Sequence, residues 1–177
     1  MKGGDHEACS IDYLIGDAER LDLERKFDLI TSNAAFQWFQ DLRKTVSNFK
    51  ANLKQQGKLY FSTFGARNFH ELRSCLQEIS PKYNYSQDFY SKEDLKEILS
   101  QEFKGVYIEE EEYIEEFDRV RDFLQATKKI GANSAKQDKP TMTPGLLKKL
   151  ERKYRKEFSE EGRIIVTHHL LFVKLEK

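Results

Sequence analysis

The sequence predicts an α/β fold, an open sheet flanked by helices. Short β-branched or aromatic runs alternate with segments in which apolar residues recur every three or four positions. The order of these elements (strand, strand–helix, strand–helix–helix, strand–helix–helix, strand) is typical of such a sheet. The 177 residues suffice for one domain, and no low-complexity linker divides them.

The first half of the chain contains three expected strands and one helix. Residues 10–15 and 27–31 are short apolar runs that end in turn-forming residues, and residues 58–64 form a third. The apolar residues of 42–53 are spaced by four, three and four, so they share one helix face. Asp41 precedes this helix and is expected to be its N-cap.

The second half is expected to be more helical. Apolar residues at helical spacing predict helices over 69–79, 91–99, 117–127 and 143–158, and apolar runs predict strands over 103–113 and 163–175. Ser91 and Thr143 are expected N-caps, Pro144 a first helical residue, and Gly131 a C-terminal helix cap before a polar loop at 133–140. Strand 163–175 is apolar on both faces, which predicts an interior position in the sheet.

Composition excludes several functions. Thirty Lys and Arg balance thirty Asp and Glu, which argues against a nucleic-acid binder. No window of 18 apolar residues could span a membrane, and the first residues lack the apolar core of a signal peptide. Cys9 and Cys75 stand apart, as is typical of free thiols in a reducing cytoplasm. The adjacent His168 and His169 point to opposite faces of a strand, so no metal site is expected there.

Two loops follow expected strands and are the candidate site. In 16–19, Asp17 could accept a hydrogen bond from an exocyclic amine such as that of adenine, or simply cap its own turn. In 32–38, an Asn and two alanines allow close approach of a ligand. The aromatic residues that follow could face a sulfonium cation or pack beneath the sheet edge. Ligands of open α/β sheets bind beyond the carboxyl ends of strands, where both loops should lie.

These loops carry a resemblance to a known family. Gly16–Glu19, Phe27–Asn33, Gln37–Trp38 and Asp41–Leu42, with Gly57 before Leu59–Phe64, resemble the class I S-adenosylmethionine-dependent methyltransferases. More narrowly, the chain is similar to the malonyl-acyl-carrier-protein O-methyltransferases of biotin synthesis. This similarity rests on the Ser-Asn-Ala-x-x-Gln-Trp loop and on residues 62–65 with 68–72, 123–133 and 167–172.

The resemblance implies an open Rossmann-like sheet with a helical lid inserted at 66–100 and 115–158, in a single domain over 1–177. It implies methyl transfer from S-adenosylmethionine to the free carboxylate of malonyl-acyl-carrier protein. The family's first strand and glycine-rich loop are not found, because none of the nine glycines forms a G-x-G after a strand. The sheet is therefore expected to be incomplete at its N-terminus, as in a truncated chain, and to bind the cofactor weakly or not at all.

The resemblance also implies roles for individual residues. Asp17 would accept from the adenine amine beside the Ala18 backbone, and Asn33 and Ala34 would lie along the methionine part of the cofactor. The aromatic walls would be Phe36 and Trp38. No general base is expected, because a carboxylic acid is already ionised at neutral pH. The candidate residues for binding the acceptor carboxylate are Arg67, Arg121, Lys128, Lys129 and His168.

One further cluster suggests a partner surface. Six cations lie within nine residues of the helix at 143–158, namely Lys148, Lys149, Arg152, Lys153, Arg155 and Lys156. Such a cluster would attract an acidic carrier protein, or it could be merely the solvent face of the helix. Two other functions stay open: a methyltransferase for small carboxylates such as trans-aconitate, and a non-catalytic remnant that does not bind the cofactor.

Overall fold

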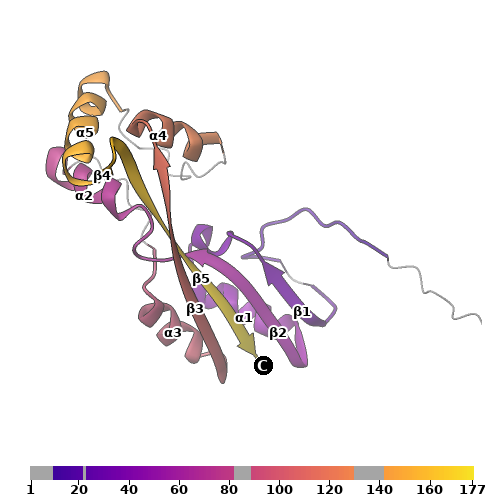
Figure 1. Ribbon diagram of the computed structural model, residues 1–177. Coiled ribbons are helices and arrows are strands. Elements are labelled where there is room, and N and C mark those ends of the chain that lie inside the picture. The colour runs from indigo at the N-terminus through magenta and orange to yellow at the C-terminus, as the bar shows by residue number, and fades with distance from the viewer. Residues whose placement is uncertain (1–9, 22, 82–88, 130–141) are drawn as a thin grey trace, which may run out of the picture.

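The computed structural model describes residues 10–21, 23–81, 89–129 and 142–177 (Figure 1). The strands are β1 (Phe27–Ser32), β2 (Leu53–Phe64), β3 (Gly105–Phe117), β4 (Ser159–Glu160) and β5 (Arg163–Glu176). The helices are η1 (Phe36–Trp38), α1 (Leu42–Asn52), α2 (His70–Ile79), α3 (Lys92–Ser100), α4 (Val120–Lys129) and α5 (Pro144–Glu157). This arrangement confirms the predicted α/β class.

The sheet has the order β1-β2-β5-β3, and β4 pairs with the start of β5. β1 runs parallel to β2, whereas β5 runs antiparallel to both β2 and β3. The interior position predicted for strand 163–175 is confirmed, because β5 lies between β2 and β3. The glutamate-rich strand β3 lies at one edge, where its charged side chains stay in water.

β5 supports two separate cores, one on each of its faces. Near its C-terminal end, Leu171, Val173 and Leu175 join a core that includes residues of α1 and α3. Near its start, Ile164 and Val166 point to the opposite face and join a core formed with α2, α4 and α5. Figure 1 shows this second group of helices gathered at the end of the molecule toward which β2 points.

The predicted helix caps are confirmed in geometry. Asp41 accepts from the backbone N–H of Lys44 at 3.0 Å, and Ser91 accepts from that of Asp94 at 3.0 Å. Thr143 Oγ1 accepts from the N–H three residues later at 3.2 Å, with proline in the first turn. Each cap satisfies a backbone donor that the helix itself leaves unpaired. The proposed cap at 131 and the loop at 133–140 lie outside the described residues.

The strand predicted at Ser10–Ile15 is wrong. These residues form no strand and are exposed, and the side chain of Ile15 is fully open to water. A β-prone segment needs a neighbouring strand to satisfy its backbone and cover its side chains. Within the described chain, β1 pairs on only one side, with β2, and residues 10–15 do not pair with its other edge.

One face of the sheet is left uncovered by the described helices. Leu29, Tyr60, Tyr107 and Phe172 come from four neighbouring strands, and each keeps between 38% and 56% of its surface exposed. The register brings residues 60, 172 and 107 to this same face, where they line a hollow of about 510 Å³. No helix in the described part of the chain is long and apolar enough to cross a membrane.

Candidate functional site

The loop 32–38 is anchored to the carboxyl end of β2. The Ala34 N–H donates to both the carbonyl oxygen and the hydroxyl of Ser62, at 3.2 and 3.1 Å. The Ser62 hydroxyl in turn donates to the side-chain oxygen of Asn33. Ala34 has a positive φ of 50°, a conformation uncommon for residues other than glycine. The loop is therefore held in one strained shape that exposes Asn33 at the edge of the hollow on the uncovered face.

Glu19 joins the first predicted loop to the start of α1. Its Oε1 accepts from the backbone N–H groups of Gln40 and Asp41 at 2.9 and 3.0 Å, next to the start of α1. The Thr45 hydroxyl lies 3.3 Å from the same oxygen. A carboxylate is favourable at this point because the helix N-terminus carries partial positive charge. These contacts place loop 16–19 beside the start of α1, which follows loop 32–38 in the chain.

Sequence analysis missed the role of Glu19, because the contact depends on a partner some twenty residues away. The only available signal was its position beside Asp17 in the first loop. Asp17 itself accepts from the Glu19 N–H at 3.0 Å and lies 3.5 Å from Arg20. Its carboxylate caps its own turn and is half exposed, and Ala18 lines a separate hollow of about 250 Å³ with Leu29.

The two predicted aromatic walls differ in burial. The Phe36 ring is only 4% exposed and stacks on Phe61, with centroids 3.6 Å apart and planes at 4°. It belongs to the core beneath the sheet, so the geometry favours the aromatic-cluster interpretation for this residue. Trp38, two residues later, keeps 38% of its surface exposed and could contact a ligand.

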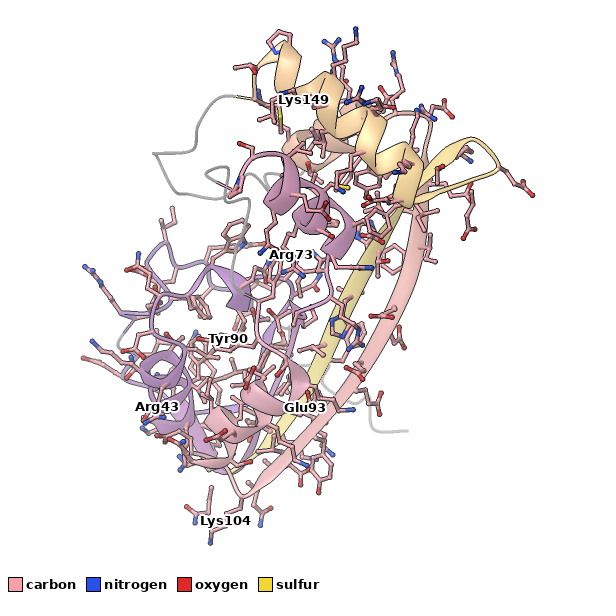
Figure 2. The ribbon with its side chains drawn as sticks, turned by 90° about the vertical axis from the view of Figure 1, so that its left-hand side faces the viewer. Arg43, Arg73, Tyr90, Glu93, Lys104 and Lys149 are labelled. Carbon is pink, nitrogen blue, oxygen red and sulfur yellow. The ribbon has the colours of Figure 1, made fainter. Side chains whose placement is uncertain are left out.

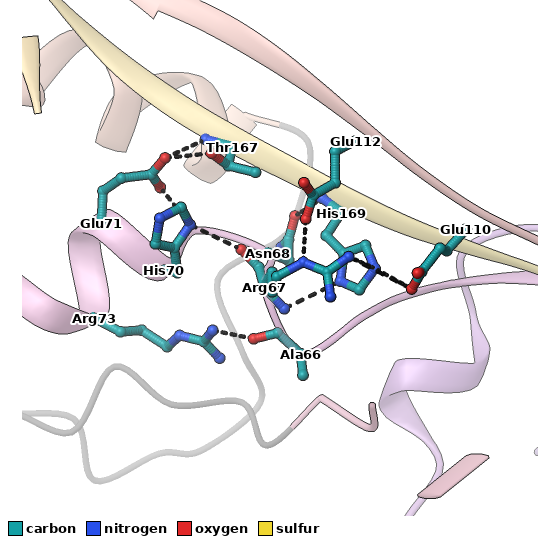
Figure 3. Close-up of polar contacts among 10 residues, drawn as sticks. All are labelled: Ala66, Arg67, Asn68, His70, Glu71, Arg73, Glu110, Glu112, Thr167 and His169. Carbon is teal, nitrogen blue, oxygen red and sulfur yellow. Dashed lines mark hydrogen bonds and ion pairs between the residues drawn. The ribbon is translucent and has the colours of Figure 1, made fainter. Parts of the chain in front are cut away.

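Arg67 lies just beyond the carboxyl end of β2, in a polar cluster with β3 and β5 (Figure 3). Its Nε donates to Glu112, and its Nη2 lies 3.5 Å from Glu110. The hydrogen bond from His169 holds the pKa of Glu110 below its ordinary value, and the charge of Arg67 adds to this effect. Arg67 is half exposed, so it could exchange a glutamate for another carboxylate.

The buried His169 side chain fixes the backbone of Arg67 through a hydrogen bond. Its Nδ1 accepts from the Arg67 backbone N–H at 3.1 Å, so the neutral ring carries its proton on Nε2. That nitrogen lies 3.2 Å from Glu110 Oε2, to which it donates, and also 3.2 Å from Nη2 of Arg67. The ring is 1% exposed and packs directly on Gly65, where a Cβ would lie 2.3 Å from two ring atoms. Glycine is therefore required at this position.

After β2 ends, the following segment stays attached to β5 through isolated backbone hydrogen bonds and one buried side chain. The N–H groups of Gly65 and Phe69 donate to the carbonyls of His169 and Thr167, at 2.9 and 2.8 Å. The buried Glu71 accepts from the backbone N–H of Thr167 at 2.9 Å and from its hydroxyl (Figure 3). These bonds fix the start of α2 to the middle of β5, and with it the backbone that carries Arg67.

The other predicted carboxylate-binding residues do not join this cluster. Arg121, Lys128 and Lys129 are exposed on α4. His168 stacks on Tyr113, with centroids 4.4 Å apart, and contacts Glu115 at 2.9 Å on the opposite face of β5 from His169. The described residues contain no group of three or more His, Cys, Asp or Glu side chains arranged to hold a metal ion.

Comparison with known proteins gives consistent matches. A family model described as a methyltransferase domain matches residues 6–103. Malonyl-acyl-carrier-protein O-methyltransferase 1 of Ilyobacter polytropus is 38% identical over 171 residues, which cover 97% of this chain and 64% of the relative. The Bacillus anthracis enzyme of the same name is 37% identical over 167 residues, covering 91% and 62%. The chain thus spans less than two thirds of these relatives.

Solved structures agree in fold. The YcgJ protein of Bacillus subtilis matches with a TM-score of 0.56 at 17% identity, over 92% of this chain and 69% of that one. A methyltransferase-class protein of Bacillus halodurans matches with a TM-score of 0.54 at 21% identity, over the same shares. At these identities the likeness establishes the shared Rossmann-like fold alone.

Proposed function

This chain belongs to the methyltransferase-domain family, and we propose that it contributes to methyl transfer from S-adenosylmethionine to the free carboxylate of malonyl-acyl-carrier protein. The observation that carries the proposal is the contact of Glu19, in loop 16–19, with the backbone of Gln40 and Asp41, which follow loop 32–38 at the carboxyl edge of β1 and β2. The names of the relatives supply the acceptor. A resident cofactor and a carrier-bound acceptor would meet at this edge.

The residues fit half of a cofactor site. Four of the predicted residues in the two loops are at least partly accessible, namely Asp17, Ala18, Asn33 and Trp38. Ala34 contributes differently, because its N–H is already donated to Ser62 and its role is to shape the loop. None of the nine glycines of this chain forms the glycine-rich loop that would hold the remainder of the cofactor.

The incomplete sheet is part of the same proposal. β1 is paired in parallel, yet it has a neighbour on only one side among the described strands. Parallel strands are usually covered on both faces, whereas Leu29 of β1 is exposed. A further element covering this face would bury its exposed aromatic side chains, and that burial would remove apolar surface from water.

The chemistry requires positioning more than acid–base catalysis. S-adenosylmethionine, when bound, supplies an electrophilic methyl group to a carboxylate that is already ionised, because carboxylic acids have pKa values of about 4. The chain must hold that carboxylate in line and exclude water, and it needs no general base. We assign the holding role to Arg67, the one predicted cation that lies at the carboxyl end of β2. The acceptor carboxylate would replace Glu112 as the hydrogen-bond partner of the Arg67 guanidinium.

Calorimetry with S-adenosylmethionine tests the proposal on two proteins. One is this chain, and the other is a fusion that adds the glycine-rich segment of a family member to its N-terminus. We expect binding to the fusion alone, and methyl transfer from labelled cofactor to malonyl-acyl-carrier protein in preference to free dicarboxylates. A fusion that binds the cofactor and methylates free dicarboxylates equally well would favour a small-molecule acceptor. A fusion that binds no cofactor would refute the enzyme function.

A further inference from the structure

A basic groove runs between α5 and the end of α2. It is an open hollow of about 820 Å³, lined by Ile79 of α2 and by Lys149, Arg152 and Lys156 of α5. The three cations are spaced by three and four residues, so they share one helix face. Figure 2 shows Lys149 on α5 at the end of the molecule farthest from Lys104.

The structure separates these three cations from Lys153 and Arg155 of the six-residue cluster. Lys153 lies at the base of the groove and pairs with Glu78 and Glu157, at 2.6 and 2.7 Å. Arg155 turns away to Glu151 at 2.8 Å and to the Gly162 carbonyl at 2.8 Å. Both therefore serve the packing of α5 itself.

Lys149, Arg152 and Lys156 have no ion pair within the part of the chain that the structure describes, and all three are exposed. Like charges at this spacing destabilise a helix by roughly 0.2–0.5 kcal/mol per pair. Lys156 lies in the last turn of α5, where a cation is favourable, but Lys149 and Arg152 lie earlier in the helix and gain no such stabilisation. Their arrangement around an apolar residue, Ile79, is that of a contact surface with a charged rim.

The charge of the whole chain is polarised, although its formal net charge is zero. The cationic groove lies on α5, whereas β3 carries six glutamates at 109–112, 115 and 116. Glu110 and Glu112 pair with Arg67, Glu115 contacts His168 and Glu116 pairs with Arg163, yet glutamates outnumber these cations and the strand stays acidic and exposed. An acidic partner would be drawn to the groove and repelled by β3, which orients its approach.

We propose that this groove docks an acidic protein surface, and that its occupant is the acyl-carrier protein that presents the malonyl group. This rests on the proposed function for the identity of the partner. Lys149, Arg152 and Lys156 would face carboxylates of the carrier, and Ile79 would contact an apolar side chain. The group of α2, α4 and α5 stands beyond the carboxyl end of β2 (Figure 1), the strand end that Arg67 follows in the chain, so a docked carrier would lie on that side of the molecule.

Binding of acyl-carrier protein to this chain tests the docking surface directly, without any requirement for catalysis. The test variant reverses the groove in K149E/R152E/K156E. The matched control, R43E/K44E/K96E, makes the same change in net charge at exposed positions of α1 and α3, with Arg43 far from Lys149 in Figure 2. Urea unfolding checks that both variants stay folded.

We expect the groove variant to weaken carrier binding by at least about tenfold at low salt, and the control by less than about twofold. Wild-type affinity should fall as salt rises, and the groove variant should lose that dependence. Equal weakening in both variants, no weakening in the groove variant, or no carrier binding by the wild type would overturn the proposal. The groove substitutions can also be made in the fusion protein. If they leave its KM for malonyl-acyl-carrier protein unchanged, the docking proposal is refuted but the proposed methyl transfer is not.

Discussion

Replacing Gly65 by alanine is the sharpest test of the cluster beneath Arg67. An added Cβ would lie 2.3 Å from both Cε1 and Nδ1 of His169, a separation that real Cβ atoms do not reach. The imidazole is 1% exposed and held by hydrogen bonds on both nitrogens, so it cannot turn aside freely. The ring must be displaced, and the Arg67 N–H then loses its acceptor.

The magnitude follows from two costs and one offset. Overpacking a buried site costs about 1–3 kcal/mol, and leaving a buried donor unsatisfied costs about 1–3 kcal/mol. Alanine restricts the unfolded chain more than glycine does, which returns about 0.4–1 kcal/mol. The free energy of unfolding should therefore fall by about 1–5 kcal/mol.

Urea unfolding followed by circular dichroism measures this free energy through linear extrapolation. Gly145→Ala is the matched control, since a Cβ there meets no atom within 4 Å and the residue lies in α5. That control should be neutral or stabilising by up to about 1 kcal/mol. In the double variant with His169→Ala, the two losses should fall short of additivity by at least about 1 kcal/mol. A Gly65→Ala protein within about 0.5 kcal/mol of wild type, or strict additivity, would refute the reasoning.

Three further outcomes are expected. Asp41→Ala should lower the free energy of unfolding by about 0.5–2 kcal/mol in the same urea assay, because α1 loses its N-cap; no change would contradict the cap. In a Cys9→Ser background, Cys75 should react with a thiol reagent at pH 8 only as fast as the protein unfolds, because burial raises the pKa of its thiol to about 11; rapid labelling of the folded protein would disprove this. The stability that Glu110 contributes should be present at neutral pH and be lost as pH falls through its lowered pKa, below the ordinary 4.5, because the hydrogen bond from His169 favours the ionised carboxylate. The difference in unfolding free energy between wild type and Glu110→Gln should therefore shrink in acid, and a constant difference would contradict the sign.

Local patterns predicted the secondary structure well, because caps and periodicity act over a few residues. Asp41, Ser91 and Thr143 cap the helices they were expected to cap. The two-faced apolarity of 163–175 predicted an interior strand correctly. It could not predict that the two faces serve different cores at the two ends, since that depends on which helices fold onto each end.

The site was predicted in position but only partly in its residues. Loop 32–38 follows β1 as expected, but residues 16–19 follow no strand, and Glu19 ties them to Gln40 and Asp41 at the start of α1. The roles of Glu19 and His169 could not be predicted, because their partners lie far away in sequence. Phe36 illustrates the opposite limit, where an aromatic residue in a candidate loop is drawn into the core by stacking on Phe61. The strand expected at Ser10–Ile15 shows that β propensity alone does not make a strand without a neighbour.

The change of face along β5 has a mechanical consequence. The α2, α4 and α5 group and the main sheet share one continuous two-stranded ribbon of β3 and β5 (Figure 1). Tilting that helical group toward the two ligand loops must twist the ribbon near Thr167 and His169, where Glu71 and Gly65 grip it. Twisting such a ribbon costs energy, so the helical group should resist displacement relative to the loops and return to its position afterwards.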